Sequence, residues 1–214
     1  MSKIIVLMGA PGAGKGTQAR LLHERLNLPQ ISTGDMFRAL KEAQTPLAAE
    51  VRALMAAGQL VPDDVTIRVV RERTAQDDCK NGYILDGFPR TPAQAAMLEK
   101  LALEQGKKIQ AIEIEVPREL LSKRMVGRRN CPICGEIYNM FFKPPKVDNV
   151  CDRHPETQLN HRADDNLGTV QARLTTYEEQ TRPLLDYYLA ADLLHVVYGT
   201  REAEVIYADI VKLV

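Results

Sequence analysis

The feature that most constrains the fold is a glycine-rich segment, residues 9–17, which directly follows the apolar run of residues 4–8. The apolar run predicts a buried strand, and the glycines predict a tight turn leading into a helix that begins near Lys15. Small residues let backbone N–H groups converge on phosphate oxygens, and the helix N-terminus adds partial positive charge. The segment therefore predicts a phosphate-binding loop (P-loop), in which Lys15 reaches the outer phosphates of a nucleoside triphosphate.

The residues that would handle Mg²⁺ depart from the general P-loop pattern. Gly16 stands where Ser or Thr usually follows the lysine, and the hydroxyl comes one residue later, on Thr17. We therefore expect Mg²⁺ to be held more by nucleotide phosphates and water than by a side chain. Asp86 ends a second apolar run, where a carboxylate beside a P-loop commonly orders Mg²⁺ directly or through water. The alternative role for Asp86 is to cap a turn.

Apolar runs alternate with helical patterns along the chain, which predicts an α/β fold of the P-loop NTPase type, with three layers and a mostly parallel sheet. Strands are expected near residues 3–8, 29–32, 83–86, 111–116 and 193–197, and the longest helix over 166–190. Two segments break the alternation. Residues 32–61 have helical patterns without a strand, and residues 127–165 are rich in Cys, Pro, Asp, Asn and His. Both are expected to be insertions that close over a ligand.

Composition excludes some classes of partner. The 28 basic and 28 acidic residues give no net charge, so no global field attracts nucleic acid or an anionic membrane. No stretch approaches the ~20 apolar residues of a membrane span, and the N-terminus lacks the pattern of a signal peptide. We therefore expect a cytoplasmic protein with reduced cysteines, and a monomer because no exposed apolar stripe stands out.

Residues 131–134 and 151–154 form a CxxC and a CxxH motif separated by sixteen residues. Two such motifs on a small irregular segment predict a closed, structural Zn²⁺ site, which would replace an apolar core. The predicted ligands are Cys131, Cys134, Cys151 and His154. His161 is an alternative fourth ligand, and the donor set would also accept Co²⁺ or Fe²⁺.

Several motifs occur in a fixed order along the chain, at residues 9–17, 31–38, 58–63, 85–91, 126–129 and 162–166. In this order and at these spacings they resemble the adenylate kinases, a family of nucleoside monophosphate kinases, over nearly the full length. The resemblance implies reversible, Mg²⁺-dependent transfer of a phosphoryl group from ATP to AMP to give two ADP, with a role in adenine nucleotide balance. One class of the family carries a zinc-binding lid of this layout, with Cys or Asp where this chain has His154.

The resemblance also implies a division of labour along the chain. Residues 1–31, 62–126 and 166–214 would form the core, 32–61 a small helical AMP-binding segment, and 127–165 a zinc-ribbon-like lid. The implied ATP contacts are Gly12, Ala13, Gly14, Lys15, Gly16, Thr17, Arg124, Arg128, Ile137, Tyr138 and Arg201. The implied AMP contacts are Thr33, Arg38, Gln59, Leu60, Val61, Gly87, Phe88, Pro89, Arg90, Gln94, Arg162 and Arg173. The implied catalytic set, which offsets the charge of the transferred group, is Lys15, Arg90, Arg124, Arg128, Arg162 and Arg173.

Two alternatives stay open at this point. A related kinase would prefer another base or use GTP as donor, whereas Thr33 and Gln94 match positions that face the AMP base in adenylate kinases. A protein of a different class would join a nucleic-acid-binding zinc ribbon to a P-loop switch. Zero net charge and scarce aromatic residues argue against that second reading.

Overall fold

A five-stranded parallel sheet forms the centre of the protein, in the order β2-β3-β1-β4-β9. The computed structural model describes residues 2–39 and 43–214. The strands are β1 (Lys3–Met8), β2 (Gln30–Ser32), β3 (Gly82–Asp86), β4 (Lys108–Glu115) and β9 (Leu194–Tyr198). The predicted α/β class with a parallel sheet is confirmed.

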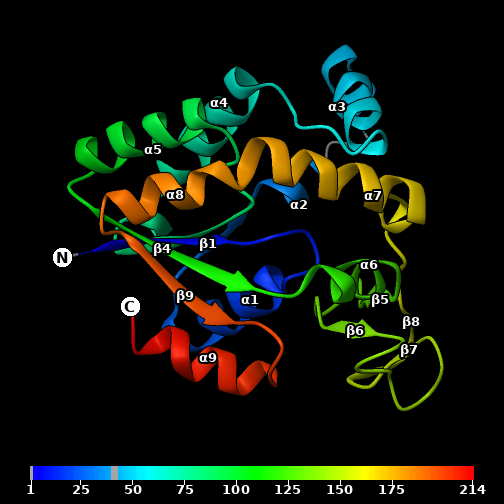
Figure 1. Ribbon diagram of the computed structural model, residues 1–214. Helices are drawn as coiled ribbons and strands as arrows, with labels where there is room; N and C mark the ends of the chain where they lie inside the picture. The colour runs from blue at the N-terminus through cyan, green and yellow to red at the C-terminus, as the bar shows by residue number, and fades with distance from the viewer. Residues whose placement is uncertain (1, 40–42) are drawn as a thin grey trace.

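Helices cover both faces of the sheet, as Figure 1 shows. Along β1, Ile4, Val6 and Met8 face one side, where they pack in an apolar cluster with α4 (Asp63–Thr74), α5 (Pro92–Glu104) and α8 (Pro183–Ala190). Ile5 and Leu7 face the other side and pack with α1 (Lys15–Leu26) and α9 (Ala203–Val211). Because alternate residues of a strand point to opposite faces, the continuous apolar run of residues 4–8 supplies both halves of the core.

The strand register brings the candidate phosphate-binding residues to one edge of the sheet. Leu7, just before the P-loop, pairs with Asp86 at the end of β3, and Asp86 pairs on its other side with Ser32 at the end of β2. The turn between β1 and α1 and the start of α2 (Thr33–Ala39) therefore lie at the same carboxyl edge. Parallel α/β sheets bind their ligands at this edge.

The first insertion contains α2 and α3 (Pro46–Ala56), with residues 40–42 of the predicted helical region lying outside the described residues. A separate apolar cluster holds it to the start of α4, made by Phe37, Val51, Val61 and Val65. Thr45 caps α3, because its hydroxyl accepts a hydrogen bond from the backbone N–H of Ala48. The insertion thus has a small core of its own, apart from the sheet.

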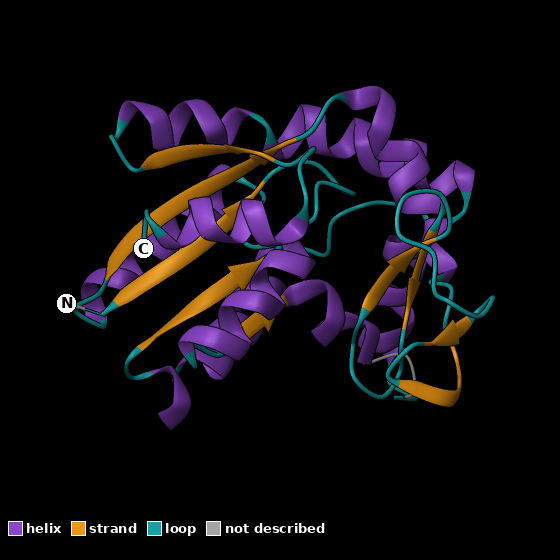
Figure 2. Cartoon of the chain, turned by 90° about the horizontal axis from the view of Figure 1, so that it is seen from below, coloured by secondary structure: helices purple, strands orange, loops and turns teal. Residues whose placement is uncertain are grey.

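The second insertion is not irregular, as the sequence suggested, but contains two short antiparallel strand pairs. These are β5 (Arg128–Asn130) with β6 (Ile137–Asn139), and β7 (Val150–Cys151) with β8 (His154–Gln158), followed by a 3₁₀ turn, η3 (Ala163–Asp165). The segment follows α6 (Arg118–Val126) and stands apart from the main sheet in Figure 2. Strands of two to five residues are too short to show an alternating pattern in sequence.

The single helix predicted over residues 166–190 is wrong in its continuity. The chain forms α7 (Leu167–Thr176), a π-helical turn η4 (Tyr177–Thr181) and then α8. Pro183 has no N–H to donate, and the N–H of Arg182 bonds to the carbonyl of Tyr177, five residues back.

A further 3₁₀ turn, η2 (Asp77–Cys79), precedes β3. Across the described residues, helices long and apolar enough to span a membrane are absent.

Candidate functional site

A cavity of about 600 Å³ lies at the carboxyl edge of the sheet, between the core and the two insertions. It is lined by nearly all the side chains expected to handle phosphate. The residues predicted to contact nucleotide or Mg²⁺ that line it are Gly12, Ala13, Gly14, Lys15, Gly16, Thr17, Arg38, Leu60, Asp86, Gly87, Pro89, Arg90, Arg124, Arg128, Ile137, Tyr138, Arg162, Arg173 and Arg201.

A smaller cavity adjoins the first and shares Arg38, Leu60, Gly87, Arg90 and Arg173 with it. The other predicted residues that line it are Thr33, Gln59, Val61 and Gln94. Phe88 is the exception among the predicted AMP contacts. Its side chain is 1% exposed, packs in the apolar cluster beside the sheet and lines neither cavity. Burial of this apolar ring stabilises the fold, so the Phe88 side chain belongs to the core and not to the cavity lining.

The P-loop has the backbone conformation that its glycines permit. Gly14, immediately before α1, has a φ of 106°, and a Cβ at Gly9 would lie 2.5 Å from the carbonyl oxygen of Ile114. Lys15 folds back over the loop and donates hydrogen bonds to the carbonyls of Gly9 (2.7 Å) and Ala10 (2.9 Å). Burial lowers the pKa of Lys15 to about 8, although the nearby Asp86 carboxylate opposes the shift. A bound phosphate would favour the charged form of this lysine.

Aspartates hold the arginines of the cavity in place. Asp165, which is 0% exposed, lies 2.6 Å from Arg128 and 3.2 Å from Arg173. Asp164 lies 3.0 Å from Arg173. Both aspartates belong to the motif at 162–166, where they directly follow Arg162 and Ala163, but no role was predicted for them from the sequence.

Asp35, in the first turn of α2, does the same, and it lies 2.6 Å from Arg38 and 3.5 Å from Arg162. This aspartate joins the first insertion to the end of the second. The arginines nonetheless remain in excess. Burial and neighbouring cations lower the pKa of Arg162 and of Arg173 to about 10, and burial lowers the pKa of Arg90. Every one of them stays protonated at neutral pH, so the cavity is suited to a polyanion.

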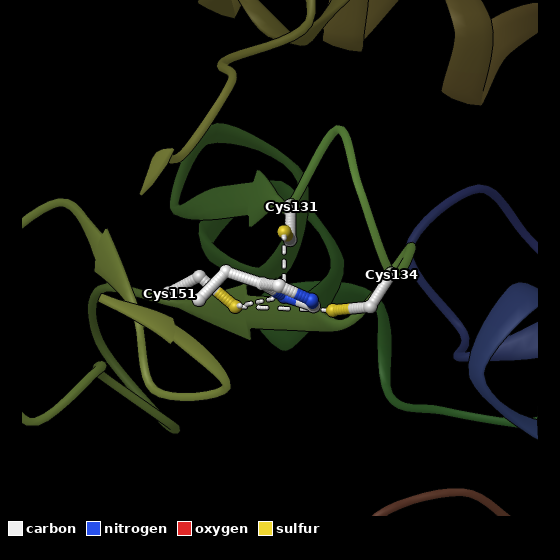
Figure 3. Close-up of side chains that lie close together, drawn as sticks. Cys131, Cys134 and Cys151 are labelled. Carbon is white, nitrogen blue, oxygen red and sulfur yellow. Dashed lines mark hydrogen bonds between the residues drawn. The ribbon is translucent and has the colours of Figure 1, made fainter. Parts of the chain in front are cut away.

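The four predicted metal ligands come together within the second insertion. Figure 3 shows the three cysteines with their sulfurs turned toward one another. Their ligand atoms lie within 4.8 Å of one another. The sulfurs of Cys134 and Cys151 are 3.8 Å apart, and Nδ1 of His154 is 3.8 Å from the sulfur of Cys131 and 3.6 Å from that of Cys151. Tetrahedral Zn²⁺ with bonds of about 2.3 Å to sulfur places two sulfurs about 3.8 Å apart. The donor set therefore fits Zn²⁺ in both chemistry and spacing, and His161 is outside the group.

Two predicted nucleotide contacts have other partners as well. The hydroxyl of Tyr138 lies 3.6 Å from the sulfur of Cys151 and accepts a hydrogen bond from the backbone N–H of Asp152 (2.9 Å). This tyrosine supports the Cys/His cluster while it lines the cavity. Arg201 donates to Asp209 at 2.5 Å, which holds its side chain against α9 at the cavity wall.

A parallel sheet with a P-loop, together with an arginine-rich cavity at the sheet's carboxyl edge, defines a phosphotransferase of the P-loop class. The comparisons agree, since the family model for adenylate kinase matches residues 7–193. The chain belongs to the adenylate kinase family. It is 48% identical to the adenylate kinase of Bacillus subtilis (96% of this chain, 95% of the relative) and 50% identical to that of Lachnoclostridium phytofermentans (97% and 95%). It is 49% identical to that of Clostridium perfringens, covering 98% of this chain and 97% of the relative.

Proposed function

We propose that the protein transfers the terminal phosphoryl group of ATP reversibly to AMP, giving two ADP. ATP would occupy the P-loop side of the larger cavity, and AMP the smaller cavity. The observation that carries this proposal is the meeting of the two cavities at Arg38, Arg90 and Arg173, with Lys15 beside them. Two anions that must approach each other need cations where they meet.

Transfer of a phosphoryl group from ATP to AMP requires that the negative charge of the phosphates be neutralised and that water be excluded. It does not require a general base. The attacking oxygen of AMP is a phosphate oxygen, already ionised at neutral pH. Lys15 and the arginines would neutralise the charge on both phosphate groups and align them. Arg124 would act from α6, Arg128 from the start of the second insertion, and Arg162 from the end of that insertion.

The candidate residue for Mg²⁺ is Asp86, at the end of β3. Asp86 lies beside the start of α1, with its carboxylate oxygen 3.5 Å from the place that a Cβ on Gly16 would take. Asp86 would hold Mg²⁺ through water, near the hydroxyl of Thr17. Mg²⁺ bound with ATP would offset part of the negative charge of the phosphates.

We further propose that residues 32–61 and 127–165 are the segments that close over the nucleotides, with the core formed by 1–31, 62–126 and 166–214. A structural Zn²⁺ held by Cys131, Cys134, Cys151 and His154 would keep the second segment rigid. That segment has a buried cluster of only Cys131, Tyr138, Cys151 and Leu159 among its described residues, so a metal would supply much of its stability.

A coupled assay of ADP formation tests the proposal, with Mg·ATP as donor and AMP, CMP, UMP or GMP as acceptor at equal concentration. We expect strong activity with AMP and little with the other three. Repeating the AMP series with Mg·GTP tests the donor. Activity with another acceptor base would overturn the adenine assignment, and absence of transfer to every acceptor, in protein with its metal bound, would overturn the proposed reaction.

A further inference from the structure

The side-chain amide of Gln94 is held at both ends. This residue is 2% exposed and lies on the first turn of α5, where it lines the smaller cavity. Its Oε1 accepts a hydrogen bond from the backbone N–H of Arg90 (2.8 Å), and its Nε2 donates to Oδ1 of Asp63 (2.7 Å). The second oxygen of Asp63 accepts from the hydroxyl of Thr91 (2.9 Å), so the carboxylate is itself fixed.

These partners set the direction of the amide. A reversed Gln94 would place its NH₂ group against the N–H of Arg90 and its oxygen against the Asp63 carboxylate. Two hydrogen bonds would be replaced by two repulsive contacts in a buried place, which is costly. Because a primary amide has two N–H bonds and two lone pairs, Gln94 retains one donor and one acceptor for a ligand, in a fixed order.

The hydroxyl of Thr33, which also lines this cavity, is likewise fixed as a hydrogen-bond acceptor toward a ligand. The hydroxyl of Thr33 donates its hydrogen to the carbonyl of Gly87 (2.8 Å), so toward a ligand Thr33 can only accept. The cavity thus offers two acceptors and a single donor from Thr33 and Gln94. A base with an exocyclic amino group beside an unprotonated ring nitrogen matches this order.

We propose that Asp63 is a positioning residue that sets base selectivity by fixing the direction of the Gln94 amide. In this orientation, the Gln94 amide oxygen can accept from the exocyclic amino group of adenine. The Gln94 NH₂ group can donate to the unprotonated ring nitrogen next to it. Hypoxanthine and guanine present a carbonyl acceptor next to a ring N–H and require the opposite order. The inference rests on the proposed function, because it assumes that the smaller cavity takes a nucleoside monophosphate.

The test compares AMP with IMP, whose bases differ chiefly in this donor and acceptor order. Asp63→Leu removes the acceptor, while Asp63→Asn keeps an oxygen that can accept from Gln94. Asp64→Leu is the matched control, because it removes the same charge from an exposed residue on the same first turn of α4. For each variant, kcat and KM are measured for both acceptors at saturating Mg·ATP.

We expect Asp63→Leu to lower the AMP-to-IMP ratio of kcat/KM by about tenfold or more, mostly through KM for AMP. Asp63→Asn should retain most of the selectivity, and Asp64→Leu all of it. KM for ATP should stay within about twofold of wild type in each variant. If Asp63→Leu does not fold, Asp63→Ala removes the same acceptor with less apolar surface.

An Asp63→Leu or Asp63→Ala enzyme with the wild-type ratio would overturn the inference, as would equal losses for AMP and IMP, because a merely structural role lowers both alike. Wild-type protein that phosphorylates neither acceptor would instead overturn the proposed function. The two failures are therefore distinguished by the wild-type measurement.

Discussion

The guanidinium of Arg20 lies 2.8 Å from the carboxylate of Glu136, and this ion pair joins α1 to the segment that carries the Cys/His cluster. Both side chains are mostly buried, at 14% and 9% exposed. Each has a second partner in its own part of the chain, Glu24 for Arg20 (2.7 Å) and Lys143 for Glu136 (2.6 Å). The contact can therefore break without leaving either charge unpaired.

Glu136→Gln should weaken the docking of residues 127–165 on α1. A partly buried ion pair contributes about 1 kcal/mol to such docking. Because its loss weakens closure over ATP by that amount, we expect KM for ATP to rise by about three- to tenfold and KM for AMP to stay unchanged. Steady-state kinetics with each substrate varied in turn would measure this. Lys143→Met is the control, since it removes a partner within the segment and leaves the pair with Arg20 in place. Equal KM values for ATP in wild type and Glu136→Gln would contradict the prediction.

His154→Ala should reduce bound metal to well below one equivalent per chain and lower the thermal midpoint, because the three cysteines would lack their fourth donor. His161→Ala is the matched control. It changes the same residue type in the same segment, outside the ligand group. Metal analysis and calorimetry of both proteins would decide. If His154→Ala kept its full metal content and His161→Ala lost it, His161 and not His154 would be the fourth ligand.

Asp165→Asn should lower both stability and turnover. The carboxylate is fully buried between Arg128 and Arg173, so its neutralisation leaves two cations less compensated. We expect a loss of about 3 kcal/mol in the free energy of unfolding, together with a drop in kcat, since Arg128 would lose the group that orients it. Denaturant unfolding and kinetics at saturating substrate would measure the two effects. Asp148→Asn, an exposed change in the same part of the chain, should behave like wild type.

Local patterns were enough to predict the sheet and the P-loop, because each is encoded by neighbouring residues. The run at 4–8 and the glycines that follow it specify β1, the turn and α1 without reference to the rest of the chain. Pro183, which is favoured at the first position of a new helix, was the available sign of the break at residues 177–181. The hydrogen bond from the N–H of Arg182 to the carbonyl of Tyr177, five residues back, leaves no signal in composition.

The arginines of the site were found through motifs, but their aspartate partners were not. Asp63 and Gln94 are 31 residues apart, and Arg128 and Asp165 are 37 apart. Such pairs form only when the strands and insertions are assembled. They therefore cannot be predicted from the spacing of neighbouring residues in the sequence. Phe88 shows the converse, because it belongs to a site motif and yet packs in the core.

Binding of ATP should weaken as pH rises through about 8. Burial lowers the pKa of Lys15 to about 8, so below this pH the free protein already carries the cation that the phosphates require. Above it, ATP must bind together with a proton, and each further pH unit weakens binding by up to tenfold. From pH 7 to pH 9 we expect the Kd for Mg·ATP to rise by about tenfold at constant ionic strength, measured by titration calorimetry. Lys15→Arg keeps its charge across this range, so its Kd, though higher, should be nearly independent of pH. Parallel pH profiles for the two proteins would show that some other group causes the dependence.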